Sequence, residues 1–141
     1  MDVIFSPFEE TYVFQKQRFQ DQRGSLIELY RNEEMVPFLD SNRFVQDLFT
    51  VSKSGVLRGL HFQLDQPQGK LISVVHGKIF DVFVDIRIDS TSFGKWHGIE
   101  LSDENALQVY LPPGFAHGFL TLSNSASVNY KLTNYYDPND Q

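Results

Sequence analysis

The sequence predicts an all-β domain, a sandwich or barrel, that occupies residues 1–141 as a single unit. Apolar and polar residues alternate with a period of two over most of the chain, and turn residues interrupt this alternation at even intervals. About ten short strands with almost no helix are typical of this fold class. The length indicates one domain. Such a fold has a cleft between its sheets in which a small ligand can bind.

The first half of the chain supplies the N-terminal strands and one irregular insert. In order, the expected elements are a strand beginning at Tyr12-Val13-Phe14, a turn at 21–24 (DQRG), a strand at 25–30 (SLIELY), a short helical or irregular insert at 31–41, a strand at 44–52, a turn at Ser54-Gly55, a strand at 56–64 and a loop at 65–69.

The second half continues the same pattern. The expected elements are two strands within 70–87 joined at His76-Gly77-Lys78, then strands at 95–101, 107–111, 118–122 and 127–136, with turns at 112–114 (PPG) and 123–125 (SNS).

The second strand within residues 70–87 has one wholly apolar face, which consists of Phe80, Val82, Val84 and Ile86. We expect that face to pack against a second sheet. Asp81 and Asp85 lie on its other face. A solvent-facing position is favoured for Asp85, which precedes Arg87 by two residues, whereas Asp81 is equally consistent with a solvent-facing and a functional position.

Composition excludes several classes of function. The net charge is −6 and there is no block of basic residues, so nucleic-acid binding is not expected. There is no cysteine, which fits a cytoplasmic protein and excludes disulfides and thiolate chemistry. The N-terminus lacks the pattern of a signal peptide, and no apolar run reaches the ~18 residues of a membrane span.

The stretch GVLRGLHFQLDQPQGK, residues 55–70, gathers Arg58, His61 and Lys70 among apolar residues. A histidine in such surroundings is more often structural than catalytic. However, a second histidine, His117, lies between glycines in PPGFAHGF, where the backbone can approach a ligand closely. Histidine, lysine and tyrosine in one dry cleft suit the removal of a proton from carbon beside a carbonyl. Neutral histidine accepts the proton, an ammonium stabilises the enolate, and a phenol returns a proton.

A metal site is a weaker alternative. His61 and His117 with Asp81 or Asp85 would give two histidines and one carboxylate, a reasonable donor set. The His-x-His pair of metal-binding cupins is absent, because Gln63 occupies its second position. Spacing alone therefore supports a metal weakly.

Many motifs of the chain resemble, in order, those of the dTDP-4-dehydrorhamnose 3,5-epimerases of deoxysugar biosynthesis. These motifs are DQRGSLIELY, FVQD, GVLRGLHFQ, QGK, FDVFVDIR, SFGKW, LSDEN, PPGFAHGF and YKLTNYY, so the resemblance extends over nearly the whole chain. It implies a cupin-type jelly roll, a dTDP-linked 4-keto-6-deoxyhexose as substrate, a homodimer formed through the N-terminal strands, and no metal or other cofactor.

The resemblance also implies roles for individual residues. His61 matches the general base at C3 and C5, Lys70 the group that stabilises the enolate at O4, and Tyr130 the general acid on the opposite face. The positions that match substrate contacts are Arg58 and His117 at the sugar and diphosphate, and Arg23, Glu28 and Gln46 at the nucleotide, with Arg23 and Glu28 reaching across the dimer. Tyr136 could stack on the thymine, or be an exposed aromatic at a strand end.

The chain departs from the family in three places. Members usually continue beyond the NYY segment into a tail with an aspartate that orients the catalytic histidine, and no residue after Tyr136 matches it; we expect Asp81 to substitute. Leu48 and Thr50 replace an asparagine and a serine of the family, which could alter the nucleotide or sugar accepted. Leu26 replaces an aromatic residue.

Three functions stay open from the sequence. The first is epimerisation at both C3 and C5, which Tyr130 favours because inversion needs an acid on the far face. The second is a one-carbon epimerase or keto-sugar isomerase on the same scaffold. The third is a non-catalytic binder of nucleotide sugars.

Overall fold

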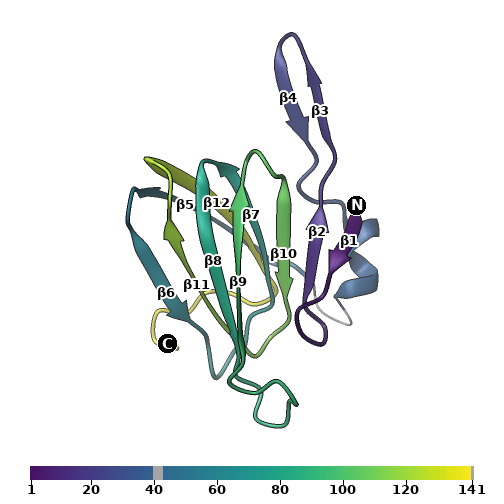
Figure 1. Cartoon of the computed structure of the whole chain (residues 1–141). Helices are drawn as coiled ribbons and strands as arrows, with labels where there is room; N and C mark the ends of the chain where they lie inside the picture. Colours follow the sequence, from purple (N-terminus) through teal and green to yellow (C-terminus); the bar gives the residue numbers. More distant parts are fainter. Residues whose placement is uncertain (40–42, 141) are drawn as a thin grey trace.

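Two antiparallel sheets packed face to face form the body of the protein, seen in a computed structural model that describes residues 1–39 and 43–140 (Figure 1). The elements are β1 (Asp2–Phe5), β2 (Tyr12–Gln15), β3 (Arg18–Asp21), β4 (Gly24–Ile27), α1 (Asn32–Met35), the 3-10 helix η1 (Val36–Phe38), β5 (Gln46–Lys53), β6 (Leu57–His61), β7 (Lys70–His76), β8 (Lys78–Asp85), β9 (Trp96–Ser102), β10 (Leu107–Leu111), β11 (Phe115–Thr121) and β12 (Ser125–Leu132). The predicted all-β class is confirmed, and the architecture is the cupin-like jelly roll.

The larger sheet has the strand order β1-β2-β10-β7-β12-β5, and the smaller has the order β6-β11-β8-β9. Strands β3 and β4 form a separate hairpin that projects away from the two-sheet body (Figure 1). Neither short helix in the described part of the chain is long and apolar enough to cross a membrane.

The core lies between the two sheets, where alternate residues of facing strands interlock. Its buried members are Val13, Ile72, Val74, Ile79, Phe83, Leu101, Val109, Leu111, Phe115, Phe119, Ala126 and Val128. Each large apolar side chain buried in this way contributes about 1.5–3 kcal/mol to folding. This layer fixes the distance between the sheets and therefore the width of any cleft at their open end.

A second apolar cluster covers the outer face of the larger sheet. Met35 and Leu39, carried by α1 and the end of η1, pack on Phe14, Leu71 and Tyr110. The predicted insert at 31–41 is thus helical over 32–38, and its positions 40 and 41 lie outside the described residues. The insert shields one side of the sheet whose other side forms the core.

The prediction for the face of β8 was wrong. Ile79, Asp81, Phe83 and Asp85 are the buried residues, whereas Phe80, Val82 and Val84 are half-buried. Asp85, expected to face solvent, is fully buried because Arg87, Ser90 and Ser92 donate hydrogen bonds to its carboxylate. Burial alone would raise the pKa of Asp85, but these hydrogen bonds outweigh it and hold the pKa well below its usual value.

Two strands were not predicted. All four residues of β1 are exposed, and most of β3 is exposed, so neither shows the alternation of a half-buried strand. Both form through pairing with a neighbour, β1 with β2 and β3 with β4. The predicted strands at 56–64 and 127–136 end earlier, at His61 and Leu132. The residues after each strand form loops that are hydrogen-bonded to each other.

Two glycines bring β6 and β11 into close contact. A Cβ on Gly118 would lie 2.5 Å from the carbonyl oxygen of Arg58, and a Cβ on Gly59 would lie 2.6 Å from that of His117. Real Cβ atoms do not approach backbone so closely, so only glycine fits at this crossing. The contact sets the spacing between the strand that carries His61 and the strand that carries His117.

We expect Gly118→Ala to lower the free energy of unfolding by about 3 kcal/mol, because backbone on both strands must move to admit the methyl group. Gly94→Ala is the control: no atom lies within 4 Å of a Cβ there, and the only strain is a φ of +76°, which costs about 1 kcal/mol. Urea denaturation of both variants measures the difference. An equal loss in the two variants would mean that the contact between β6 and β11 is not tight.

Candidate active site

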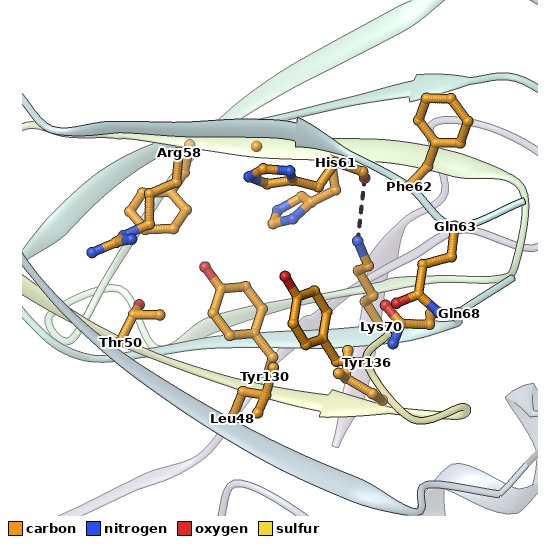
Figure 2. A pocket seen from close by; sticks show the side chains of 14 residues that line it. Leu48, Thr50, Arg58, His61, Phe62, Gln63, Gln68, Lys70, Tyr130 and Tyr136 are labelled. Carbon is orange, nitrogen blue, oxygen red and sulfur yellow. Dashed lines mark hydrogen bonds between the residues drawn. The ribbon is translucent and has the colours of Figure 1, made fainter. Parts of the chain in front are cut away.

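A cavity of about 300 Å³ opens between the two sheets at the end of the sandwich where β6 and β12 face each other (Figure 2). It brings together residues from five strands and two loops. Its lining consists of Leu48, Thr50, Arg58, His61, Phe62, Gln63, Gln68, Lys70, His117, Gly118, Phe119, Leu132, Tyr130 and Tyr136. Most of the wall is apolar, and the polar groups converge from both sheets, as in ligand sites generally.

The smaller sheet supplies one wall. His61 and His117 are register partners on β6 and β11. Arg58 lies on β6, and its Nε donates to Ser52 Oγ on β5 at 2.9 Å, which ties the guanidinium to the opposite sheet. His61 is open to solvent on one side. Partial burial, followed by the charges of Lys70, His117 and Arg58, lowers the pKa of His61 below its ordinary value of 6.5. The ring is therefore neutral near pH 7 and can accept a proton.

Lys70 lies at the floor of the cavity, at the first position of β7. Only 7% of the residue is exposed, and its Nζ donates to the backbone carbonyl of His61 at 3.3 Å (Figure 2). Burial lowers the pKa of Lys70 to about 8, and the negative charge of Asp81 opposes part of this shift. At pH 7 the side chain is mainly an ammonium ion, held in a dry site against the backbone of the candidate base.

Tyr130 faces the histidines from the larger sheet. Its hydroxyl points toward the wall that carries Arg58 and His61 (Figure 2), and its ring meets the His117 ring edge to face, with centroids 6.0 Å apart. Burial raises the pKa of Tyr130 well above 10, while the Thr50 hydroxyl and the Arg58 charge oppose the shift. The phenol therefore keeps its proton across the physiological range.

Asp81 lies behind the cavity and contacts His117, not His61. Its Oδ2 is 2.7 Å from His117 Nε2, and both residues are buried, with 0% and 4% exposed. This differs from the expectation that Asp81 orients His61: β8 pairs with β11, which places the carboxylate under the histidine of β11. Any influence of Asp81 on His61 passes through His117 or through its charge.

The nucleotide-contact candidates do not all reach the cavity. Arg23 lies at the tip of the β3–β4 hairpin, with 90% of its side chain exposed and its guanidinium bound to Asp21. Glu28 is paired with Arg31 at 2.6 Å. Neither lines the cavity of its own chain.

Tyr136, in contrast, lines the cavity, and Gln46, which is not part of the lining, contacts Tyr136. The backbone N–H of Tyr136 donates to Gln46 Oε1 at 2.8 Å, and Tyr136 lines the cavity wall beside Tyr130 (Figure 2). Gln46 therefore positions the segment that carries Tyr136.

The metal alternative finds no support in the geometry. Among residues 1–39 and 43–140, no three histidine or carboxylate side chains are grouped as metal ligands. Asp85 is engaged by Arg87 and two serines, and Asp81 approaches only one of the two histidines.

Residues of the loop 62–69 contribute to the site beyond what the sequence indicated. Gln63 and Gln68 line the cavity, and each donates to a backbone carbonyl of the segment after β12, at Tyr135 and Asn134 respectively. These contacts join positions more than sixty residues apart, so no local pattern could have revealed them.

The arrangement can carry out proton transfer at carbon. A neutral imidazole on one sheet faces a protonated phenol on the other, and an ammonium ion lies at the floor between them. The cavity lining as described contains Arg58 and Lys70 but no carboxylate, so it favours an anionic ligand.

Fold and site together define a jelly-roll protein with a centre for acid–base chemistry on an anionic small molecule. The model of the dTDP-4-dehydrorhamnose 3,5-epimerase family matches residues 6–141. The dTDP-4-dehydrorhamnose 3,5-epimerase of Methanothermobacter thermautotrophicus is 48% identical over 138 residues, 96% of this chain and 73% of that protein. The chain belongs to this family.

Solved structures of epimerases are also similar to this chain. The dTDP-6-deoxy-D-glucose-3,5-epimerase of Legionella pneumophila, in complex with dTDP-4-keto-L-rhamnose, superposes with a TM-score of 0.94 at 45% identity, covering 99% of this chain and 74% of that one. A 3′-monoepimerase of Streptomyces bikiniensis, in complex with dTDP-quinovose, has a TM-score of 0.87 at 30% identity, covering 95% of this chain and 69% of that one.

We expect Asp81→Asn to lower the pKa of Lys70 below about 8, because the carboxylate charge is what opposes the effect of burial. Titration of the lysine Cε resonance by NMR measures it. Asp47→Asn is the control. It removes an exposed carboxylate that pairs with Lys131, and it should leave the pKa of Lys70 unchanged. A Lys70 pKa that is unchanged or raised in Asp81→Asn would contradict this electrostatic account.

Proposed function

We propose that the protein epimerises a dTDP-4-keto-6-deoxyhexose at C3 and C5 and so converts dTDP-4-dehydro-6-deoxyglucose to dTDP-4-dehydrorhamnose. The observation that carries the proposal is the placement of His61 and Tyr130 on opposite sheets across one cavity, with the Lys70 ammonium at its floor. Relatives 39–48% identical to the chain bear the 3,5-epimerase name.

In the proposed first step, His61 removes the proton from the carbon beside the C4 ketone. The electrons of the broken C–H bond move into the C4 oxygen, which becomes an enolate, and His61 becomes an imidazolium. The Lys70 ammonium stabilises the developing negative charge, and its burial strengthens that interaction. The lowered pKa of His61 keeps it available as a base.

In the second step, Tyr130 delivers its proton to the same carbon from the opposite face, and the configuration inverts. The phenolate that remains is stabilised by the nearby charge of Arg58, which lowers the pKa of Tyr130 against the effect of burial. The His61 imidazolium then releases its proton to solvent, and the Tyr130 phenolate takes a proton from solvent, so both groups return to their starting states. The same sequence at the second carbon completes the reaction.

Binding of the nucleotide diphosphate is assigned to the basic side of the cavity. Arg58 and His117 bind the sugar and diphosphate, Gln46 contacts the nucleotide, and Tyr136 stacks on the thymine. Arg23 and Glu28 do not line the cavity of their own chain. Their contribution therefore requires a homodimer in which the β3–β4 hairpin enters the site of the partner, which its projection from the body supports (Figure 1).

We also assign the reaction to the cytoplasm, where a chain without cysteine fits the reducing environment. No metal or organic cofactor enters the proposed steps, since His61, Lys70 and Tyr130 provide base, enolate stabilisation and acid.

Incubation with dTDP-4-keto-6-deoxyglucose in deuterated water tests the proposal, with label at each carbon followed by NMR. Label at both C3 and C5 is expected. Label at one carbon only would instead identify a one-carbon epimerase, a candidate that the similarity to the Streptomyces bikiniensis 3′-monoepimerase keeps open. Binding of the nucleotide sugar without any label would leave a non-catalytic binder.

Variants separate the two proton-transfer roles. His61→Asn should abolish label at both carbons. Tyr130→Phe should still admit label, because His61 can return a deuteron to the face from which it took the proton, but epimer formation should fall by about 10²–10⁴-fold. Tyr135→Phe, whose ring is exposed and outside the cavity lining, is the control. Normal epimer formation by Tyr130→Phe would remove this residue as the acid.

The pH dependence of kcat/KM follows from the two perturbed groups. His61 must be neutral, so activity should rise with pH through a pKa below 6.5. Lys70 must be charged, so activity should fall above about pH 8. Lys70→Arg should be slower but should lose the alkaline fall, because guanidinium stays protonated. A fall at the same pH in Lys70→Arg would assign that limb to another group.

A further inference from the structure

The loop 62–69 joins the candidate base to the candidate enolate-stabilising group. It begins after His61, the last residue of β6, and ends before Lys70, the first residue of β7. Any movement of this loop shifts the two groups relative to each other. The segment 133–140, which follows β12 and which we call the C-terminal clasp, runs along this loop.

Asp140 makes the most extensive contact between the clasp and the loop. Its Oδ1 accepts hydrogen bonds from the backbone N–H groups of Leu64 at 2.8 Å and Asp65 at 3.1 Å, and its Oδ2 from those of Asp65 at 3.0 Å and Gln66 at 2.9 Å. Three consecutive amides thus surround one carboxylate. Such a nest of N–H groups binds the ionised carboxylate strongly.

The charge state of Asp140 agrees with this geometry. Only 9% of the residue is exposed. Its partial desolvation would raise the pKa, but the three backbone donors outweigh that effect and hold the pKa of Asp140 below its usual value. The carboxylate is therefore ionised at neutral pH.

Further contacts of the clasp hold both ends of the loop. In the first half, Gln63 Nε2 donates to the Tyr135 carbonyl at 3.2 Å, and Gln63 Oε1 accepts from the Asp137 N–H at 2.9 Å. The Thr133 hydroxyl accepts from the Gly69 N–H at 2.7 Å, and Asn134 Nδ2 donates to the Pro67 carbonyl at 2.8 Å. Gly69 is adjacent to Lys70, so these bonds fix the start of β7. Among the described residues of the clasp, only Asp140 accepts from backbone N–H groups in the first half of the loop.

We propose that Asp140 is a positioning residue for proton transfer: by binding the amides of Leu64, Asp65 and Gln66 it fixes the loop that sets His61 against Lys70. The inference rests on the proposed function and adds a residue that does not touch the substrate. Without the carboxylate the backbone of the first half of the loop loses its hydrogen-bond acceptor, and only the side chain of Gln63 still ties this half to the clasp. Water then reaches Lys70, and the bond from Lys70 Nζ to the His61 carbonyl lengthens.

Asp140→Asn tests the proposal, because it preserves shape but removes the charge and one acceptor oxygen. Asp137→Asn is the matched control. The Asp137 carboxylate accepts from the N–H and Nδ2 of Asn139, and among the described residues it has no hydrogen bond to the loop. Three quantities are measured in each: the kinetics of epimerisation, the dTDP affinity, and the NMR titration of Lys70.

For Asp140→Asn we expect kcat to fall at least about tenfold, since small misplacement of reacting groups is costly, with dTDP affinity within about threefold of the parent. The pKa of Lys70 should rise from about 8 toward its ordinary 10.5 as water enters. Asp137→Asn should match the parent, and Asp140→Glu should recover part of kcat. A folded Asp140→Asn with parental kcat and parental Lys70 titration would overturn the proposal.

Two further measurements keep the test decisive. If Asp140→Asn does not fold, hydrogen exchange in the parent decides: the amides of residues 64–66 should be protected, and exchange at the rate of a free peptide would overturn the proposal. If the parent itself fails to label the substrate, the proposed epimerisation is wrong, whereas the Lys70 titration and the amide exchange still report on Asp140.

Discussion

The site depends on a buried ammonium ion that is held against the backbone of the candidate base. Lys70 is almost inaccessible, yet its Nζ bonds the carbonyl of His61 and its pKa remains near 8 because Asp81 compensates part of the desolvation. A lysine buried without the opposing charge of Asp81 would have a still lower pKa. The core between the sheets, the contact of β6 with β11 and the C-terminal clasp each help to preserve this one placement.

The candidate base and the candidate acid lie on opposite sheets, and this arrangement suits inversion of configuration at carbon. His61 comes from the smaller sheet and Tyr130 from the larger, so in the proposed reaction a planar enolate between them would meet the base on one face and the acid on the other. Their pKa values are shifted in opposite directions, His61 downward and Tyr130 upward, which keeps the base deprotonated and the acid protonated at the same pH. Environments that separate two titratable groups in this way assign the acid and the base.

Alternation, turns and motifs were sufficient to predict the fold class, most strands and the cavity residues His61, Lys70, His117 and Tyr130. They failed where partners distant in sequence decide the outcome. The apolar face of β8 was assigned to the core, but Asp81 and Asp85 are buried instead: His117 bonds one oxygen of Asp81, and Arg87 and two serines bond the carboxylate of Asp85. The exposed strand β1 exists through its pairing with β2, and Asp140 binds amides some seventy residues away. Local pattern carries no information about such contacts.

A crystal structure of the protein with a bound dTDP-4-keto-6-deoxyhexose tests the central claim most directly. The account predicts the C4 oxygen within hydrogen-bond reach of Lys70 Nζ, about 2.6–3.2 Å, with His61 facing one side of the sugar ring and the Tyr130 hydroxyl facing the other. A complex in which Lys70 binds the diphosphate, or in which His61 and Tyr130 lie on the same side of the ring, would contradict it.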